Sequence, residues 1–400
     1  MLTLLLAAVV AVPQSPLSTD RVALDSELDL RVHRQTSPLV ALRLSSPVPT
    51  GLPEGSVELL QELARADTEA LAHRFGVALE LRHDPGRAVI TVSGPEAAFD
   101  AMAAILRRAT GEPDLSVASL RRARARAESR VLARLEQPGP RLRGLLHHGV
   151  HGGREPLGAE ATGLPPEAIR RIRSRLYDPA RLRVVLVGDV PDPVIRSAFA
   201  RWPGVGDPGG PIVVDSPAVA ARPQAHREWG GLAFPVEADP AVLAVTAELV
   251  RHRVARSALR YGTAEAWPDP APVLFVLGAA APGDAEVRTS AGISELPVRD
   301  SVDVAPDDMR RYLRRLVAEA AALTGPAAVE RARAAVRRRL LLEARTASGK
   351  AEIIGRVADA VGAGVSPDAY LDRVDSVRAA EVRALLTRVL ETPAVTAEAR

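Results

Sequence analysis

The chain has 400 residues, which is longer than one ordinary domain and predicts two domains. Hydrophobic residues make up 47% of it and charged residues 25%, so the composition excludes disordered, collagen-like and polytopic membrane proteins. The formal net charge is only +3, from 52 basic and 49 acidic residues, so the charge balance does not indicate a nucleic acid or an anionic membrane as a partner.

The chain contains no cysteine. Disulfides, thiolate nucleophiles, cysteine-ligated zinc and iron–sulfur clusters are therefore excluded. Nucleotide-binding glycine motifs and the G-x-S-x-G nucleophile motif are also absent, so the sequence does not point to those enzyme classes.

The first segment of the chain is an apolar run, MLTLLLAAVVAV, which is too short to span a bilayer. It is typical of the apolar part of a secretory signal, so residues 1–19 are predicted to be a signal peptide and the protein to be exported, to the periplasm or beyond the cell. The run lacks a preceding basic residue and a clear cleavage site. A first strand or a mis-assigned start is the alternative.

Downstream of this run, the sequence predicts alternating strands and helices. Two strands are expected within 22–46, a helix over 56–75, a hairpin over 77–94 and a helix over 96–110. A long Ala/Arg helix starts at Ser116 and ends at Pro138, and a further helix and a buried strand cover 165–176 and 182–187. Together these elements predict a first domain over 20–205.

A Pro/Gly-rich stretch over 203–223 marks the domain boundary, and residues 206–224 are predicted to be a linker. The pattern then restarts in a second domain over 225–400. We expect helices over 240–261, 305–323 and 326–347, and strands at VLFVLGAA and VRTSAGISEL.

The two long Ala/Arg helices indicate an internal repeat, because LRRARARAESRVLARL, which starts at Leu120, superposes on VERARAAVRRRLLLEA, which starts at Val329. Each half also has the same order of strand, helix, strands, helix and long basic helix. We therefore expect an α+β protein made of two tandem copies of one domain, each an antiparallel-leaning sheet with helices on one face.

This order of segments resembles the insulinase, pitrilysin and mitochondrial-processing-peptidase family of zinc metallopeptidases. The segments SPLVALRL, LLHHGVHGGREPLGAEATG and LYDPARLRVVLVGDV carry the resemblance in the first half, and LAVTAELVRHRVARSALRYG carries it in the second. It covers about residues 20–395. It implies that the two repeats form half of a clamshell-shaped peptidase.

Active members of that family bind zinc through H-x-x-E-H on the first helix and a distant glutamate. The resemblance places Glu58, Gln61 and Glu62 at the His, Glu and His positions, and Arg134 near the position of the distant glutamate. Both nitrogen ligands are missing, the water-activating carboxylate is an amide, and a cation stands where a ligand is needed. The chain is therefore expected to hold no zinc and to have no catalytic residues of its own.

The resemblance also implies a substrate-binding pair in the second repeat, an Arg followed seven residues later by a Tyr. Arg260 matches the Arg, whereas Trp267 stands at the Tyr position. The substrate-binding pair is therefore predicted to be present in altered form, as Arg260 and Trp267. The alternative for Arg260 is a solvated helix end with ion-pair partners.

For each of three other residue clusters, a functional interpretation is set against a purely structural one. His147, His148 and His151 could bind a metal, but Gly152 and Gly153 favour a plain loop. Glu58, Glu62 and His73 could form a replacement metal site, although a solvated acidic face is the simpler interpretation. Arginines on the long helices could contact phosphates, but interspersed glutamates favour a solvated face and no nucleic-acid partner.

We therefore predict a non-catalytic member of this family with no cofactor of its own. It would pair with an active zinc-peptidase paralogue and help to enclose a peptide or unfolded polypeptide. A stand-alone peptide-binding or scaffold protein is the alternative, and an active peptidase with non-standard ligands is a further one. No membrane span is expected.

Overall fold

The computed structural model describes residues 17–24, 27–49, 51–84, 86–151, 160–200, 202, 229–257, 259–267, 272–279, 306–361 and 365–399. The predicted linker over 206–224 and the strand VRTSAGISEL lie outside these residues, as does most of the predicted signal peptide. No helix in the described part is long and apolar enough to cross a membrane.

The elements of the N-terminal half surround a six-stranded sheet of order β1-β2-β6-β3-β5-β4. Its strands are β1 (Asp20–Val22), β2 (Asp29–His33), β3 (Leu39–Pro47), β4 (Ala78–Asp84), β5 (Arg87–Pro95) and β6 (Arg183–Val187). Its helices are α1 (Ser56–Arg74), α2 (Phe99–Thr110), α3 (Val117–Glu136), α4 (Pro138–His151), α5 (Pro166–Leu176) and α6 (Asp192–Phe199). Apart from the parallel pair β2–β6, neighbouring strands in this sheet are antiparallel.

The C-terminal half contains a four-stranded antiparallel sheet of order β10-β7-β9-β8. Its strands are β7 (Trp229–Pro235), β8 (Tyr261–Trp267), β9 (Val273–Ala279) and β10 (Val395–Ala399). Its helices are α7 (Pro240–Ala255), α8 (Pro306–Ala322), α9 (Pro326–Glu343), α10 (Ala347–Val361), α11 (Pro367–Ser376) and α12 (Ala379–Glu391).

The internal repeat is visible in the topology. The order β6-β3-β5-β4 in the first sheet matches β10-β7-β9-β8 in the second, strand for strand. The number of residues from the start of α9 to the start of α10 equals the number from the start of α3 to the start of α4. The shift that superposes the two basic helices in the sequence therefore extends to the next helix as well.

Strand alternation places different residues on the two faces of each sheet. In β3, Leu42 and Leu44 face α1 and α2 in the main core of the N-terminal half, whereas Ala41 packs against α10. In β9, Leu274 and Val276 face the core of the C-terminal half, whereas the neighbouring residues face α4. Both faces of each sheet therefore bury apolar side chains.

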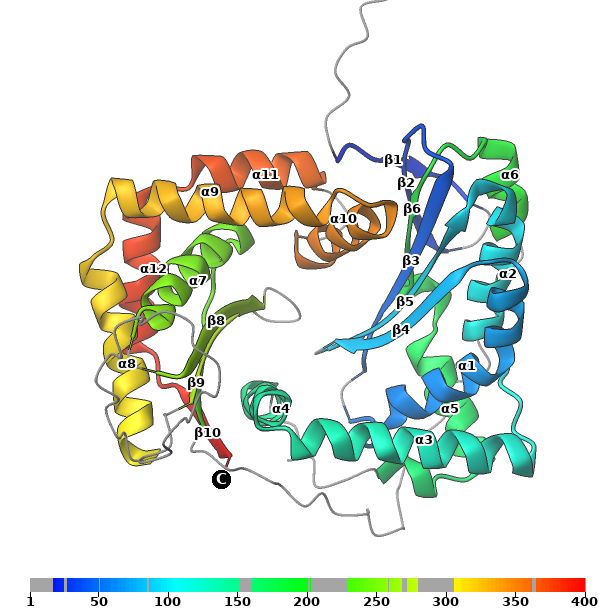
Figure 1. Ribbon diagram of the computed structural model, residues 1–400, viewed down its shortest axis with the longest axis horizontal. Helices are drawn as coiled ribbons and strands as arrows, with labels where there is room; N and C mark the ends of the chain where they lie inside the picture. The colour runs from blue at the N-terminus through cyan, green and yellow to red at the C-terminus, as the bar shows by residue number, and fades with distance from the viewer. Residues whose placement is uncertain are drawn as a thin grey trace, which may run out of the picture.

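The second face of each sheet is covered by a helix from the opposite half (Figure 1). Helix α10 lies across β3 and β6, and Ile354 shares a buried apolar cluster with Val185 and Val187. Helix α4 lies across β7 and β10, and Leu142 and Leu146 pack there. The expectation of helices on one face is thus incomplete, since it holds only for the helices of the same half.

Leu17 also belongs to the cluster around α10 and is fully buried. It falls inside the predicted signal peptide, so removal of residues 1–19 would expose part of this apolar contact. The backbone carbonyl of Ser18 is also engaged, since it lies 2.6 Å from Nδ1 of the buried His33.

Candidate functional site

The first turns of α1 hold the three predicted site residues of that helix. Glu58, Gln61 and Glu62 are only 4%, 2% and 1% exposed. The alternative of a solvated acidic face is therefore wrong. Helix α1 packs on α2, α3 and β4, so its N-terminal half is enclosed by protein. Buried carboxylates must be paired or neutralised, which makes their partners informative.

Arg134 on α3 supplies one of these partners. Its guanidinium donates to the carboxylates of Glu58 on α1 and Glu54 just before α1. The long basic helix thus brings the predicted fourth site position directly against the first one. A single cation serves two carboxylates, and burial still raises the pKa of Glu54, although Arg134 opposes that effect.

His83 on β4 is the second partner of Glu58, with its Nδ1 2.9 Å from Oε1 of the carboxylate. Burial alone would raise the pKa of Glu58 and lower that of His83. The attraction between the two groups, helped for Glu58 by Arg134, reverses both effects: the pKa of Glu58 lies well below its usual range and that of His83 is raised. The contact therefore favours the charged form of both side chains.

Gln61 and Glu62 have separate partners. Gln61 donates from Nε2 to the backbone carbonyl of Arg82 on β4, at 2.7 Å. Glu62 forms an ion pair with Arg130 on α3, at 2.7 Å, and a longer one with Arg65, at 3.6 Å. The three side chains of α1 therefore tie this helix to β4 and α3.

This donor set does not fit zinc. Tetrahedral zinc sites use neutral histidine nitrogens, thiolates and free carboxylates. Here the carboxylate of Glu58 is bonded to His83 and to the guanidinium of Arg134, so it is not free to bind a metal and has positive charge beside it. His73 is exposed at the far end of α1 and does not join the cluster. The described residues contain no group of three or more metal-binding side chains placed to hold an ion.

The histidines 147, 148 and 151 lie on helix α4, so the predicted loop is wrong. Pro138 begins a helix that continues through all three histidines. The rings of His147 and His151 lie 4.4 Å apart, as expected one turn apart on a helix. Burial, with the two neighbouring histidines, lowers the pKa of His147 to about 3, so this ring is neutral in the folded protein.

Arg260 and Trp267 lie at opposite ends of β8 and are not brought together. The predicted helix over 240–261 ends earlier, at Ala255, so Arg260 immediately precedes a strand. Seven residues of strand span about 23 Å. Arg260 is exposed, whereas the ring of Trp267 packs on Phe275 at 4.2 Å and lies 5.8 Å from His147.

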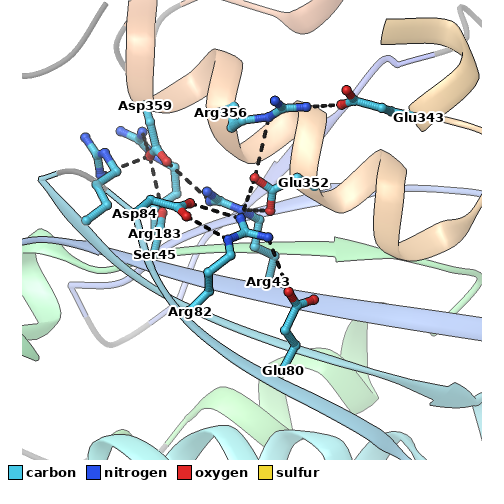
Figure 2. Close-up of polar contacts among 11 residues, drawn as sticks. Arg43, Ser45, Glu80, Arg82, Asp84, Arg183, Glu343, Glu352, Arg356 and Asp359 are labelled. Carbon is cyan, nitrogen blue, oxygen red and sulfur yellow. Dashed lines mark hydrogen bonds and ion pairs between the residues drawn. The ribbon is translucent and has the colours of Figure 1, made fainter. Parts of the chain in front are cut away.

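A cavity of about 550 Å³ lies between the halves, bounded by β3, β4, β5, β8, α4, α9 and α10. Trp267 lines it, together with equal numbers of basic and acidic side chains: Arg43, Arg82, Arg87, Arg143, Arg356, Asp84, Glu265, Glu343, Glu352 and Asp359. Figure 2 shows the network on its α10 side, where Glu352 and Asp359 point toward the arginines of the first sheet.

Arg43 is the most deeply buried of these cations, with 1% of its surface exposed. It donates from Nε to Glu352 at 2.9 Å and from Nη1 to Asp359 at 3.3 Å. Asp359 also accepts from Arg183 at 2.7 Å and from the hydroxyl of Ser45 at 3.2 Å. Each buried charge in this part of the cavity therefore has an opposite partner, which is what burial requires.

Sequence reasoning missed His83 and Glu54. The signal for His83 was present, because Leu81 and His83 share one face of a strand that alternates with the polar residues Glu80 and Arg82. Leu81 packs in the core beneath α1, so His83 had to face α1 too. Glu54 carried no such signal, since it lies in an irregular segment.

No protein-family model and no curated protein sequence matches this chain. Solved structures do match its fold over almost its whole length. A protease from Helicobacter pylori has a TM-score of 0.74 at 12% identity, over 95% of this chain and 99% of that one. The inactive domain of an M16 peptidase from Pseudomonas fluorescens has a TM-score of 0.68 at 13% identity, over 96% and 97%.

A candidate M16-like peptidase from Alicyclobacillus acidocaldarius has a TM-score of 0.69 at 12% identity, over 96% of this chain and 98% of that one. The likeness extends to both repeats at once. The expected α+β half-clamshell architecture is therefore confirmed.

Proposed function

We propose that this chain is a non-catalytic homologue of the insulinase-like M16 peptidases that helps to enclose peptide beside an active zinc-peptidase partner. The fold supports the family, since all three solved structures are described as peptidases or peptidase domains. One of them is itself described as an inactive domain.

The observation that supports the proposal of a non-catalytic chain is the ion-pair cluster around Arg134. When the chain is compared with the zinc motif of the family it resembles, Glu58 and Arg134 fall at two zinc-ligand positions. In this structure the two side chains bond to each other. Gln61, at the position of the water-activating glutamate, has an amide that cannot accept a proton and is bonded to the backbone of β4. These side chains are therefore engaged with protein partners, which supports the proposal that they act neither as metal ligands nor as a base.

A wall for a peptide chamber remains. The cavity between the halves is lined by Trp267 and by charges of both signs, which suits contact with a polypeptide of mixed composition. Within the described residues, β4 and β8 are the outermost strands of their sheets on the cavity side. A stand-alone peptide-binding protein is the second candidate, because an extended peptide can pair with an edge strand without any partner subunit.

The test is purification of the native protein from its own host, with mass spectrometry and a peptidase assay on the product. We expect a stoichiometric partner that carries H-x-x-E-H, and activity that needs both chains. Recovery of this chain alone, without activity but with peptide bound, would instead support the stand-alone binder. Chelator-sensitive cleavage by the lone chain would refute both. Export is a separate proposal, tested by sequencing the N-terminus of the native protein.

A further inference from the structure

The repeat relates not only elements but also individual cavity residues. Helix α4 recurs as α10, and Arg143 and Glu352 correspond because each is the sixth residue of its helix. Strand β4 recurs as β8, and Arg82 and Glu265 correspond because each is the fifth residue of its strand. These four residues all line the cavity between the halves.

Each helix uses this position to form an ion pair with the sheet of the opposite half. Arg143 donates to Glu265 through two bonds of 3.1 and 2.6 Å, from Nε and Nη2. The pair of Arg82 and Glu352 is 2.8 Å long. The two contacts are thus equivalent in the repeat but opposite in sign: α4 presents the cation and α10 presents the anion.

This reversal has an electrostatic consequence. Were α10 to lie on the second sheet, Glu352 would meet Glu265, and were α4 to lie on the first sheet, Arg143 would meet Arg82. Like charges held in contact away from bulk water cost several-fold more than the same charges in solvent. The four side chains are 17–34% exposed, so solvent screens them only in part.

We propose that these oppositely oriented ion pairs determine which helix covers which sheet. Each sheet accepts the helix of the other half and rejects the equivalent helix of its own half. Two copies of one domain need such a rule, because both helices are amphipathic and both sheets offer an apolar second face. The inference rests on the repeat and the contacts alone, and does not depend on the proposed function.

The test recreates each rejected contact inside the native arrangement. Arg143→Glu puts a carboxylate against Glu265, and Glu352→Arg puts a guanidinium against Arg82 and also against Arg43, the other partner of Glu352. We expect each to lower the folded-to-unfolded ratio about tenfold or more, measured by chemical denaturation of the full chain, and to speed amide exchange in α4 or α10 respectively. The double variant Arg143→Glu/Glu265→Arg restores an opposite pair, so its stability should return to within about threefold of the wild type.

Two controls separate selection by charge from simple loss of a contact. Arg143→Gln/Glu265→Gln removes both charges and should remain close to the wild type. Arg253→Glu breaks the similarly exposed pair with Glu319, in which both residues belong to the C-terminal half, so it should lower stability without speeding exchange in α4. Near-neutral single variants, or a double reversal as unstable as the single ones, would overturn the proposal.

Discussion

Arg134 shows how one partly buried arginine can link several elements of the fold. Its guanidinium lies between Glu54 and Glu58, and His83 completes the contact from β4. Three separate elements, α1, α3 and β4, meet at these charges.

Removal of the Arg134 charge should therefore be costly. In Arg134→Met the side chain stays unbranched and flexible, but Glu54 and Glu58 lose their shared cation. We expect a loss of about 2–3 kcal/mol in the free energy of unfolding, less than a fully buried pair because Arg134 is 28% exposed. Urea denaturation measures it. Arg196→Met, at an exposed pair with Asp192, should cost under about 1 kcal/mol, and equal losses would argue against this account.

His147 gives a prediction for pH. Its pKa is lowered from 6.5 to about 3 in the fold, mainly by burial. Below pH 6.5, His147 takes up a proton in the unfolded chain but not in the folded one. The contribution of this histidine to stability is therefore fully present above pH 6.5 and declines as the pH falls toward 3. His147→Phe should make the fall in melting temperature between pH 7.5 and 5 shallower than in the wild type. Parallel curves for the two proteins would contradict this.

At the scale of the element, a glycine in α10 permits the contact of that helix with the first sheet. A Cβ on Gly355 would meet the buried side chain of Arg43, within 2.6 Å of Cζ and 2.8 Å of Cδ. Arg43 cannot easily move, because it is held by Glu352 and Asp359. The absence of a side chain at this point therefore sets the distance between helix and sheet.

Gly355→Ala should be destabilising although alanine favours helices. We expect a loss of about 1–3 kcal/mol from overpacking and from the disturbed Arg43 pairs. Gly144, an interior glycine of the equivalent helix α4, is the matched control, because a Cβ there would meet nothing within 4 Å. Gly144→Ala should stabilise by about 0.5–1 kcal/mol. Thermal unfolding of both variants would refute the argument if the two shifts had the same sign.

Local pattern predicted most elements of the N-terminal half, but in the C-terminal half only α7, α8, α9 and β9, and no contacts across the halves. The 3.6-residue period located α1 and α3, and alternation located the β4–β5 hairpin. Gly152 and Gly153 misled the interpretation of the histidine segment, since Pro138 both ends α3 and begins α4. The end of α7 was placed too late, because Tyr261 belongs to β8. The placement of α4 and α10 depends on tertiary contacts that no local period carries.

At the scale of the whole molecule, the exchanged helices make the two halves dependent on each other. The cluster around Ile354 joins α10 to the first sheet, and the cluster around Leu146 joins α4 to the second. Neither half can bury the second face of its sheet without the other. We therefore expect the two repeats to unfold as one cooperative body, although the sequence consists of two similar units.

Calorimetry should consequently show one unfolding transition for the wild type, with equal calorimetric and van't Hoff enthalpies. Ile354→Ala weakens the joint and should both lower the midpoint and broaden or split the transition. Ile105→Ala removes an equally buried side chain from α2, within the N-terminal half, and should lower the midpoint of a single transition by a similar cost of about 2–4 kcal/mol. Two resolved transitions in the wild type would show that the halves unfold independently, because an intact joint transmits the loss of one half to the other.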